Sequence, residues 1–122
     1  MDISKAIAEL KKRPGFTENV GMVLVHNGVV RATRRADSAP VTRLEVHPDQ
    51  RKIDAICAEL STRPGIFAVE AKALSGTFQP GDDLLYIIVA GDFRENVHPM
   101  LLEALNRIKA EAVSKSEHVR VD

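Results

Sequence analysis

Residues 20–31 read Val-Gly-Met-Val-Leu-Val-His-Asn-Gly-Val-Val-Arg, and no other stretch of the chain says as much about the fold. The run is apolar at most positions and rich in β-branched valine, which predicts a β-strand region. It ends on Arg31, and a polar, strand-breaking segment at residues 32–40 follows with Arg34 and Arg35. The stretch therefore predicts a long strand that brings several arginines to the loop at its end.

A second group of cations lies near the far end of the chain. Arg94 opens a segment with helical periodicity, Lys109 lies near its end, and Lys115 follows six residues later. At about 100° per residue, Lys109 falls just outside the apolar stripe of this helix, where its ammonium group can reach a cleft. Cations placed where rigid elements meet loops predict a pocket for a small anion. The alternative is that these side chains are simply solvated, since lysine near a helix C-terminus is favoured by the helix dipole.

The remaining pattern predicts an α+β fold with a mostly antiparallel sheet. Pro99 fits only in the first turn of a helix or at a kink, so we expect the regular part of the last helix to begin near His98. We expect a single domain over residues 1–122, in which residues 1–16 form an N-terminal helical extension. Strands are expected at 41–47, 66–74 and 84–90, a helix at 51–62, and a short edge strand at 118–121.

A partial repeat relates the start of the chain to its middle, since Arg13-Pro14-Gly15 recurs as Arg63-Pro64-Gly65 after a similar helical pattern. Each copy predicts an amphipathic helix that stops at Pro-Gly, after which Phe16 or Ile66 opens a strand. The repeat also places Cys57 on a buried helix face, as a small core residue and not as a nucleophile.

Composition excludes several classes of protein. Seventeen basic and seventeen acidic residues among 122 leave no electrostatic footprint for nucleic acid, and four Phe, one Tyr and no Trp offer little surface for base stacking. No apolar run approaches the roughly 20 residues of a membrane helix. A single cysteine excludes an internal disulfide, so we expect a cytoplasmic protein.

No common catalytic motif is present. The sequence contains no Gly-rich phosphate loop, no Cys-x-x-Cys and no Gly-x-Ser-x-Gly, and its four histidines are scattered. We therefore expect neither a metal site nor a cofactor.

Laid end to end, however, the weaker motifs resemble the large, catalytic subunit of molybdopterin synthase, the MoaE family. The resemblance covers residues 20–117 and implies an α/β-hammerhead-like fold. The matching motifs, in chain order, are Gly28-Val29-Val30-Arg31, Leu44-Glu45-Val46-His47-Pro48, Pro80-Gly81-Asp82, Phe93-Arg94, Lys109 and Ser114-Lys115-Ser116-Glu117.

The resemblance implies a role in molybdenum cofactor biosynthesis. A small ubiquitin-like sulfur-carrier subunit would insert its thiocarboxylated Gly-Gly C-terminus into this chain, and two sulfurs would pass to cyclic pyranopterin monophosphate to give molybdopterin. Lys109 and Lys115 would be catalytic, handling protons and the leaving oxygen. The substrate phosphate and the tail would be bound by arginines, namely Arg31, Arg94, Arg34 and Arg35.

The resemblance also implies a homodimer of large subunits, with small subunits at the far ends of a heterotetramer. The continuous apolar character of residues 84–90 agrees with association through the sheets.

The chain departs from the family pattern at several positions. Phe93 stands where the family has histidine, Ala73-Leu74 replaces a His-Arg pair, and Lys109 and Lys115 are one residue closer than usual. Two interpretations follow: a divergent sulfurtransferase, or a paralogue that keeps an anion cleft without the reaction.

An alternative from another class needs no family. Residues 41–121 also fit the βαββαβ order of a ferredoxin-like module, which would bind a metabolite or a peptide and catalyse nothing. The long strand at residues 20–30 distinguishes the two, because a ferredoxin-like module has no place for it.

Overall fold

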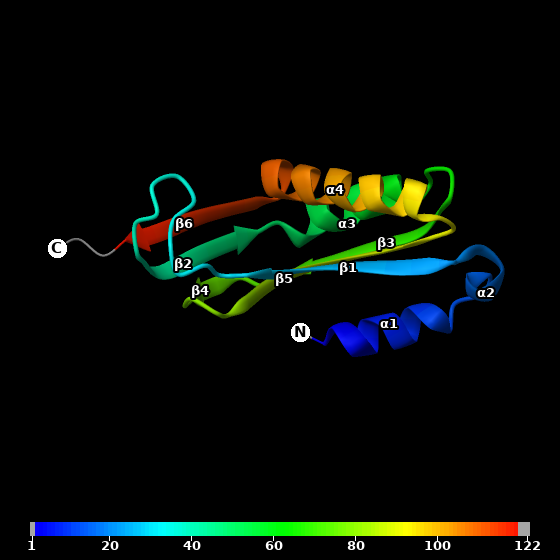
Figure 1. Cartoon of the computed structure of the whole chain (residues 1–122), viewed down its shortest axis with the longest axis horizontal. Helices are drawn as coiled ribbons and strands as arrows, with labels where there is room; N and C mark the ends of the chain where they lie inside the picture. The colour runs from blue at the N-terminus through cyan, green and yellow to red at the C-terminus, as the bar shows by residue number, and fades with distance from the viewer. Residues whose placement is uncertain (1, 120–122) are drawn as a thin grey trace.

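The computed structural model describes residues 2–119 and shows an elongated α+β molecule (Figure 1). The expected α+β class with antiparallel pairing is confirmed. The elements, in chain order, are α1 (Ile3–Lys11), α2 (Phe16–Asn19), β1 (Met22–Val29), β2 (Val41–Pro48), α3 (Gln50–Leu60), β3 (Ile66–Ala73), β4 (Gly76–Phe78), β5 (Asp83–Gly91), α4 (Arg94–Glu111) and β6 (Val113–Val119).

The first sheet has the order β1-β5-β3, with antiparallel pairing on both sides of β5. Side chains alternate across a strand, so Leu85, Ile87 and Val89 point to one face, where they are buried against α3 and α4. From the helices come, among others, Ile53, Leu60, Val97, Ala104 and Ile108. This layer of two helices on a sheet is the main hydrophobic core.

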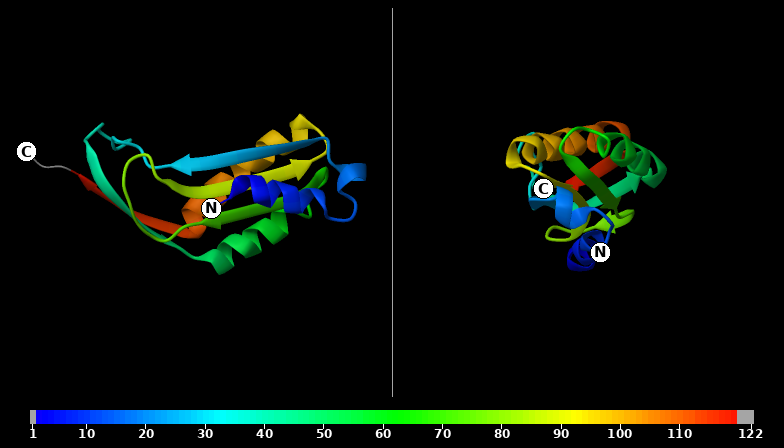
Figure 2. Two further views of the ribbon diagram at one scale, coloured as in Figure 1. Left: turned by 90° about the horizontal axis from the view of Figure 1, so that it is seen from below. Right: turned by 90° about the vertical axis from the view of Figure 1, so that its right-hand side faces the viewer.

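The opposite face of the first sheet is covered by α1, which lies along it in Figures 1 and 2. Leu10 is buried there against Ile88 and Ala90. Strand β5 is thus paired at both edges and covered on both faces. The apolar character of residues 84–90, which suggested association between subunits through this strand, is therefore explained within one chain.

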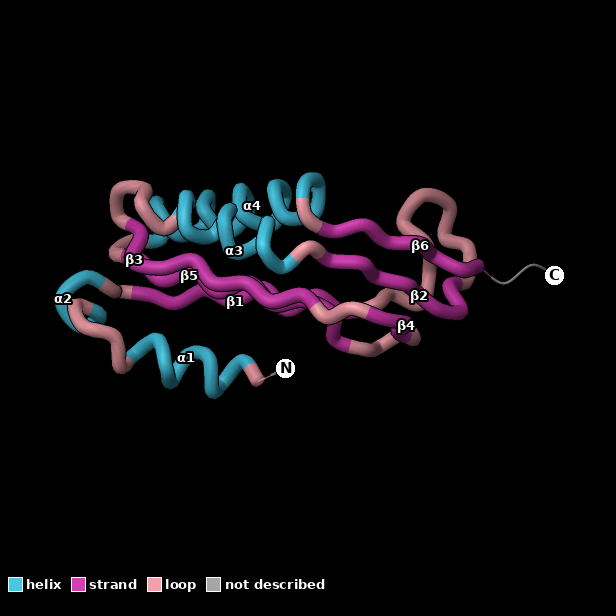
Figure 3. The backbone as a smooth tube through the Cα atoms, turned by 180° about the vertical axis from the view of Figure 1, so that it is seen from behind, coloured by secondary structure: helices cyan, strands magenta, loops and turns pink. Residues whose placement is uncertain are grey.

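The second sheet has the order β4-β2-β6 and extends beyond the ends of α3 and α4 (Figure 3). Leu44 and Val46 of β2 are buried in a small core with Val30, and Phe78 packs against it. Because this core adjoins the end of the first sheet, the two sheets meet along an apolar boundary.

The ferredoxin-like alternative is wrong. It requires one sheet in which β5 pairs with β2, whereas here β2 pairs with β4 and β6 in a separate sheet. The edge of β5 is occupied by β1, the strand that the alternative could not use.

Two element boundaries differ from the prediction. Helix α4 begins at Arg94 and not near His98, because the amides of Asn96 and Val97 both donate to the carbonyl of Phe93 and close the first turn. Pro99 lies inside the helix, where it removes only one hydrogen bond close to the N-terminus. Strand β6 begins at Val113, five residues before the expected edge strand, because it pairs along the whole of β2.

The two Arg-Pro-Gly stops share a backbone conformation but lead to different elements. Gly15 and Gly65 have φ angles of 87° and 79°. Ile66 opens a strand as predicted, but the same prediction for Phe16 is wrong because the short helix α2 begins there. The side-chain amide of Asn19 donates to the Gly15 carbonyl at 2.8 Å and stabilises this extra turn.

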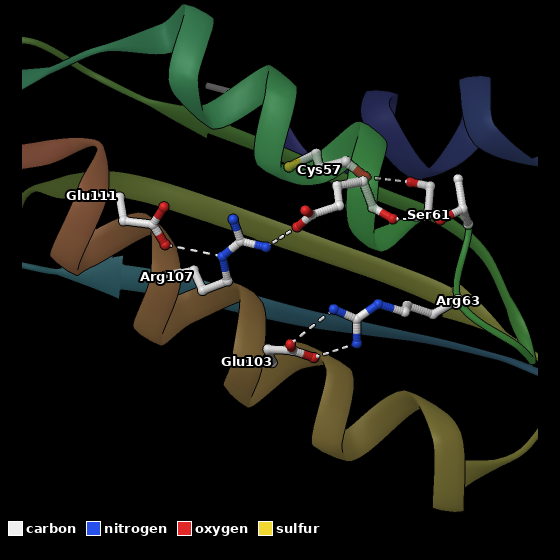
Figure 4. A network of polar contacts seen from close by, with 8 residues as sticks. Cys57, Ser61, Arg63, Glu103, Arg107 and Glu111 are labelled. Carbon is white, nitrogen blue, oxygen red and sulfur yellow. Dashed lines mark hydrogen bonds and ion pairs between the residues drawn. The ribbon is translucent and has the colours of Figure 1, made fainter.

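Polar contacts fix α4 against α3 (Figure 4). Arg107 pairs with Glu59 of α3 and, at 2.9 Å, with Glu111. Arg63 donates to both carboxylate oxygens of Glu103, at 3.2 and 3.3 Å. The C-terminal half of α4, which carries Lys109, is therefore held in place by its neighbour.

Candidate functional site

A cleft of about 550 Å³ opens where the end of the first sheet meets the second. Its floor is apolar and is formed in part by Leu44, Val46 and Leu85. Its walls carry the polar and charged side chains His26, Arg31, Thr33, Arg35, Lys109, Lys115 and Glu117. An apolar floor beneath a cationic rim suits a ligand with a flat organic part and an anionic group.

Arg31 reaches the cleft from a fixed point of the backbone. Val30, which precedes it, is buried, and its N–H donates to the Asp82 carbonyl at 2.9 Å. The Val30 carbonyl in turn accepts from the amide of Gly81 at 2.8 Å. The turn before β5 thus anchors the end of β1, and the arginine that follows extends over the cleft.

Lys109 lies in the last turn of α4, as expected beside the apolar stripe. The carbonyl of Ala112, just after the helix, accepts from the amide of Asp49 at 2.7 Å. This bond ties the junction of α4 and β6 to the junction of β2 and α3. The position of Lys109 is therefore fixed relative to both the helix layer and the second sheet.

Lys115 lies within β6, opposite Val46 of β2. Residues opposite each other in an antiparallel pair point to the same face, so the lysine shares the cleft side with buried Val46. Sequence reasoning left its position open, and the structure brings it to the cleft with Lys109, Arg31 and Arg35.

The four cations of the cleft have no carboxylate partner among the residues that the structure describes. Six arginines elsewhere in the described chain lie within 4.0 Å of a carboxylate, namely Arg13, Arg34, Arg43, Arg63, Arg94 and Arg107. Within residues 2–119, no ion pair involves Arg31, Arg35, Lys109 or Lys115. Their charge is therefore available to an anionic ligand.

The cations also act on one another. Partial burial lowers the pKa of Lys109 below its ordinary value of 10.5, and the charges of Lys115 and Arg35 lower it further. This enlarges the amine fraction of Lys109 near neutral pH and makes it a better proton donor.

Arg34 does not join this group. Its guanidinium forms a two-pronged ion pair with Asp37 in its own loop, with Nε at 3.0 Å from Oδ1. The same pairing lowers the pKa of Asp37 to about 2. Of the two loop arginines, Arg35 lines the cleft and Arg34 organises the loop.

Arg94 lies at the other end of α4 from Lys109. With a rise of about 1.5 Å per residue, the two are separated by roughly 20 Å along the helix. The Arg94 side chain is 79% exposed and lies 3.3 Å from Glu95, and its neighbour Phe93 is 66% exposed. Within one chain, the structure does not bring Arg94 to the cleft.

Sequence reasoning missed two ionisable residues of the cleft, His26 and Glu117. His26 shares the inner face of β1 with Met22 and Leu24. A histidine at the end of an otherwise apolar strand face was the sequence signal that could have identified it. Glu117 lies two residues after Lys115 in a strand and so shares its face. The sequence prediction placed the edge strand at residues 118–121, so Glu117 lay outside it and its shared face with Lys115 was not recognised.

Comparisons with known proteins identify the family of the chain. The family model described as MoaE protein matches residues 1–111. The chain belongs to the MoaE protein family. The resemblance inferred from the ordered motifs is thereby confirmed.

One curated relative of this MoaE-family chain is a probable molybdopterin synthase from Haloferax volcanii, 25% identical over 111 residues. The match covers 88% of this chain but 42% of that protein, so the chain spans less than half the length of its relative.

Solved structures share the fold. Molybdopterin synthase from Staphylococcus aureus superposes with a TM-score of 0.77 at 20% identity, covering 99% of this chain and 88% of that one. Molybdopterin cofactor biosynthesis protein E from Burkholderia multivorans gives 0.75 at 23% identity, covering 98% and 82%. A complex of subunits 1 and 2 of molybdopterin-converting factor from Helicobacter pylori gives 0.67 at 13% identity, covering 98% and 80%.

Proposed function

We propose that this chain is the large subunit of a molybdopterin synthase and acts as a sulfurtransferase in molybdenum cofactor biosynthesis. It would transfer sulfur from the thiocarboxylated C-terminus of a small partner to cyclic pyranopterin monophosphate. The observation that supports this most directly is the cleft with its four cations above an apolar floor, none of which forms an ion pair within residues 2–119. Membership of the MoaE family supports it independently.

The ligands of this reaction match the cleft in charge. The substrate carries a phosphate and a flat pterin, and the partner tail ends in an anionic thiocarboxylate. Arg31 and Arg35 bind the anionic groups, since guanidinium donates two parallel hydrogen bonds to phosphate or carboxylate. The apolar floor accommodates the ring system.

The two lysines assist the formation and cleavage of bonds in the reaction. The thiocarboxylate sulfur attacks a carbon of the substrate, a C–S bond forms, and the C–O bond at that carbon breaks. Lys109 donates its proton to the leaving oxygen, and Lys115 stabilises the negative charge that develops beside it. The tail is then attached to the substrate through its acyl–sulfur bond, which water cleaves to leave the sulfur on the pterin and a carboxylate on the tail.

Arg94 fits this proposal as a substrate-binding residue only if a second copy of the chain supplies it, in agreement with a homodimer. Mixing Arg94→Ala protein with Lys109→Ala protein tests this, because the mixed dimer contains one intact site if Arg94 acts across the interface. Restored activity after subunit exchange is the expected result. Failure to restore it, with mixed dimers verified by mass, contradicts the role in trans.

The function itself is tested by incubating the purified chain with the cyclic pterin substrate and a thiocarboxylated, Gly-Gly-ending partner. Dithiolene formation is expected, and the same partner with a plain carboxylate serves as the control. A wild-type chain that binds the partner but forms no dithiolene would instead be a non-catalytic paralogue. The exposed Phe93 keeps that second candidate open, since a phenyl ring cannot carry a proton.

We place this activity in the cytoplasm, where the single thiol stays reduced. Cys57 is buried and its pKa is raised to about 11, mainly by burial, so it takes no part in sulfur transfer. No helix among residues 2–119 is long and apolar enough to cross a membrane. Cell fractionation tests the location.

A further inference from the structure

His26 is the histidine of the cleft, since His47, His98 and His118 lie outside its lining. Its imidazole extends from the inner face of β1, opposite Ile87 of β5, at the point where the apolar core gives way to the cleft. Among residues 2–119, no hydrogen bond or ion pair engages its side chain.

The imidazole is also open on the cleft side. The next residue on the same face of β1 is Gly28, and a Cβ at this position would lie 3.6 Å from Nε2 of His26. Because glycine has no side chain there, nothing at position 28 covers this nitrogen. The uncommitted nitrogen therefore faces the space that the ligands would occupy.

We propose that His26 is a catalytic base of this cleft and accepts the proton of the water that releases the partner tail. This inference rests on the proposed function. The water oxygen attacks the acyl carbon while Nε2 takes one of its protons; the acyl C–S bond breaks and its electron pair stays on sulfur. The tail leaves as a carboxylic acid, which gives its proton to solvent, and the pterin keeps a thiolate.

The neighbouring charges suit a base. The charged groups that share the cleft with His26 are Lys109 of α4, Arg31 and Arg35 of the β1–β2 loop, and Lys115 and Glu117 of β6. Burial lowers the pKa of His26 below 6.5 and the charge of Lys109 lowers it further, so the imidazole is neutral at pH 7. Lys109, by contrast, is the proton donor of the proposed function.

A proton transfer between His26 and Lys109 also restores the starting protonation state of both groups. Lys109 has lost a proton to the leaving oxygen, and His26 has gained one from water. Imidazolium is the stronger acid of the pair, so its proton passes to the Lys109 amine, directly or through one water. Both groups then regain their starting states for the second sulfur.

The test is the rate of dithiolene formation against pH for the wild type, His26→Gln, Glu117→Gln and His47→Gln. In the wild type the rate should fall as pH drops through the pKa of His26, which lies below the ordinary value of 6.5. His26→Gln should lose this limb, slow the reaction by about 10² to 10⁴ fold, and accumulate the covalent partner–pterin adduct, which intact mass spectrometry detects. Glu117→Gln, which removes the rival base, should keep the limb, and exposed His47 on β2 is the matched histidine control.

The outcomes distinguish a failure of the His26 assignment from a failure of the proposed function. If the wild type turns over and His26→Gln keeps its rate and pH profile, the base assignment is overturned and the proposed function stands. If the wild type forms no dithiolene, both are overturned. A folding defect in His26→Gln is recognised by its Tm and by loss of partner binding, and His26→Asn then provides the second variant.

Proton NMR gives a further readout, because Lys109→Ala should raise the His26 pKa. An unchanged pKa would show that the two groups are not coupled and would overturn the proton cycle.

Discussion

Lys109 occupies a helix position where a long side chain can reach the cleft while the core beneath it stays intact. Its backbone belongs to the last turn of α4, and the side chain is exposed along part of its length. Lys109→Ala should therefore change the free energy of unfolding by no more than about 1 kcal/mol, since surface substitutions away from special features are mild. The same change should abolish sulfur transfer, because the leaving oxygen loses its proton donor.

Chemical denaturation and the dithiolene assay measure these two effects separately. Lys5→Ala is the matched control, because it removes an exposed helical lysine from α1, on the opposite side of the first sheet. An active Lys109→Ala protein would contradict the catalytic role of this lysine.

His26 gives a second prediction, for stability against pH. Its folded-state pKa lies below the unfolded value of 6.5, so the unfolded chain binds a proton more readily. Its contribution to stability is fully present above pH 6.5 and is lost as pH falls through the lowered folded pKa. The Tm of the wild type should therefore fall more than that of His26→Gln between pH 7 and pH 5, and parallel curves would contradict the shifted pKa.

At the scale of elements, the turn between α3 and β3 gives a prediction with an internal control. Gly65 and Gly81 both have positive φ, of 79° and 94°. A Cβ at Gly65 would lie 2.3 Å from Nδ2 of Asn96 and 2.8 Å from Oδ1 of Asp92, whereas a Cβ at Gly81 would meet nothing within 4 Å. Both substitutions to alanine carry the backbone penalty of about 1 kcal/mol, but Gly65→Ala adds the crowding. Its midpoint of unfolding should be clearly lower, and equal midpoints would contradict the crowding.

The sequence predicted elements well where one physical signal dominated. The apolar run of β5 and the Pro-Gly stop after α3 were both placed within a residue or two. Local patterns could not reveal which strands share a sheet. The short strand β4 and the early start of β6 exist because β2 offers both of its edges for pairing.

The same reason limited the prediction of the site. Arg31, Arg35, Lys109 and Lys115 were identified because each stands near the end of an element, and the structure brings all four to one cleft. His26 and Glu117 were missed because their relevance depends on strand register. Arg34 was included because nothing local indicated its pairing with Asp37 across a tight loop.

At the scale of the whole molecule, we expect two copies of the chain to associate. Because β5 is covered within one chain, a dimer must use another surface, and the exposed side chains of Phe93 and Leu102 offer apolar area. We expect light scattering at tens of micromolar, an order-of-magnitude choice, to give twice the monomer mass of 13.4 kDa. A single monomeric mass would contradict the homodimer and, with it, any contribution of Arg94 across an interface.

The pairing of β2 with β6 has a consequence for how the chain acquires activity. The contacts that join these strands link residues 67 and 76 positions apart in sequence, as between His47 and Ser114 and between Thr42 and His118. Closing so long a loop is slow, because the chain loses conformational entropy before the stabilising contacts form. Helices α3 and α4 can form on their own timescale, but Lys115 reaches Lys109 only when this last ladder closes. We therefore expect a partially folded chain that already contains its helices to be unable to bind an anion.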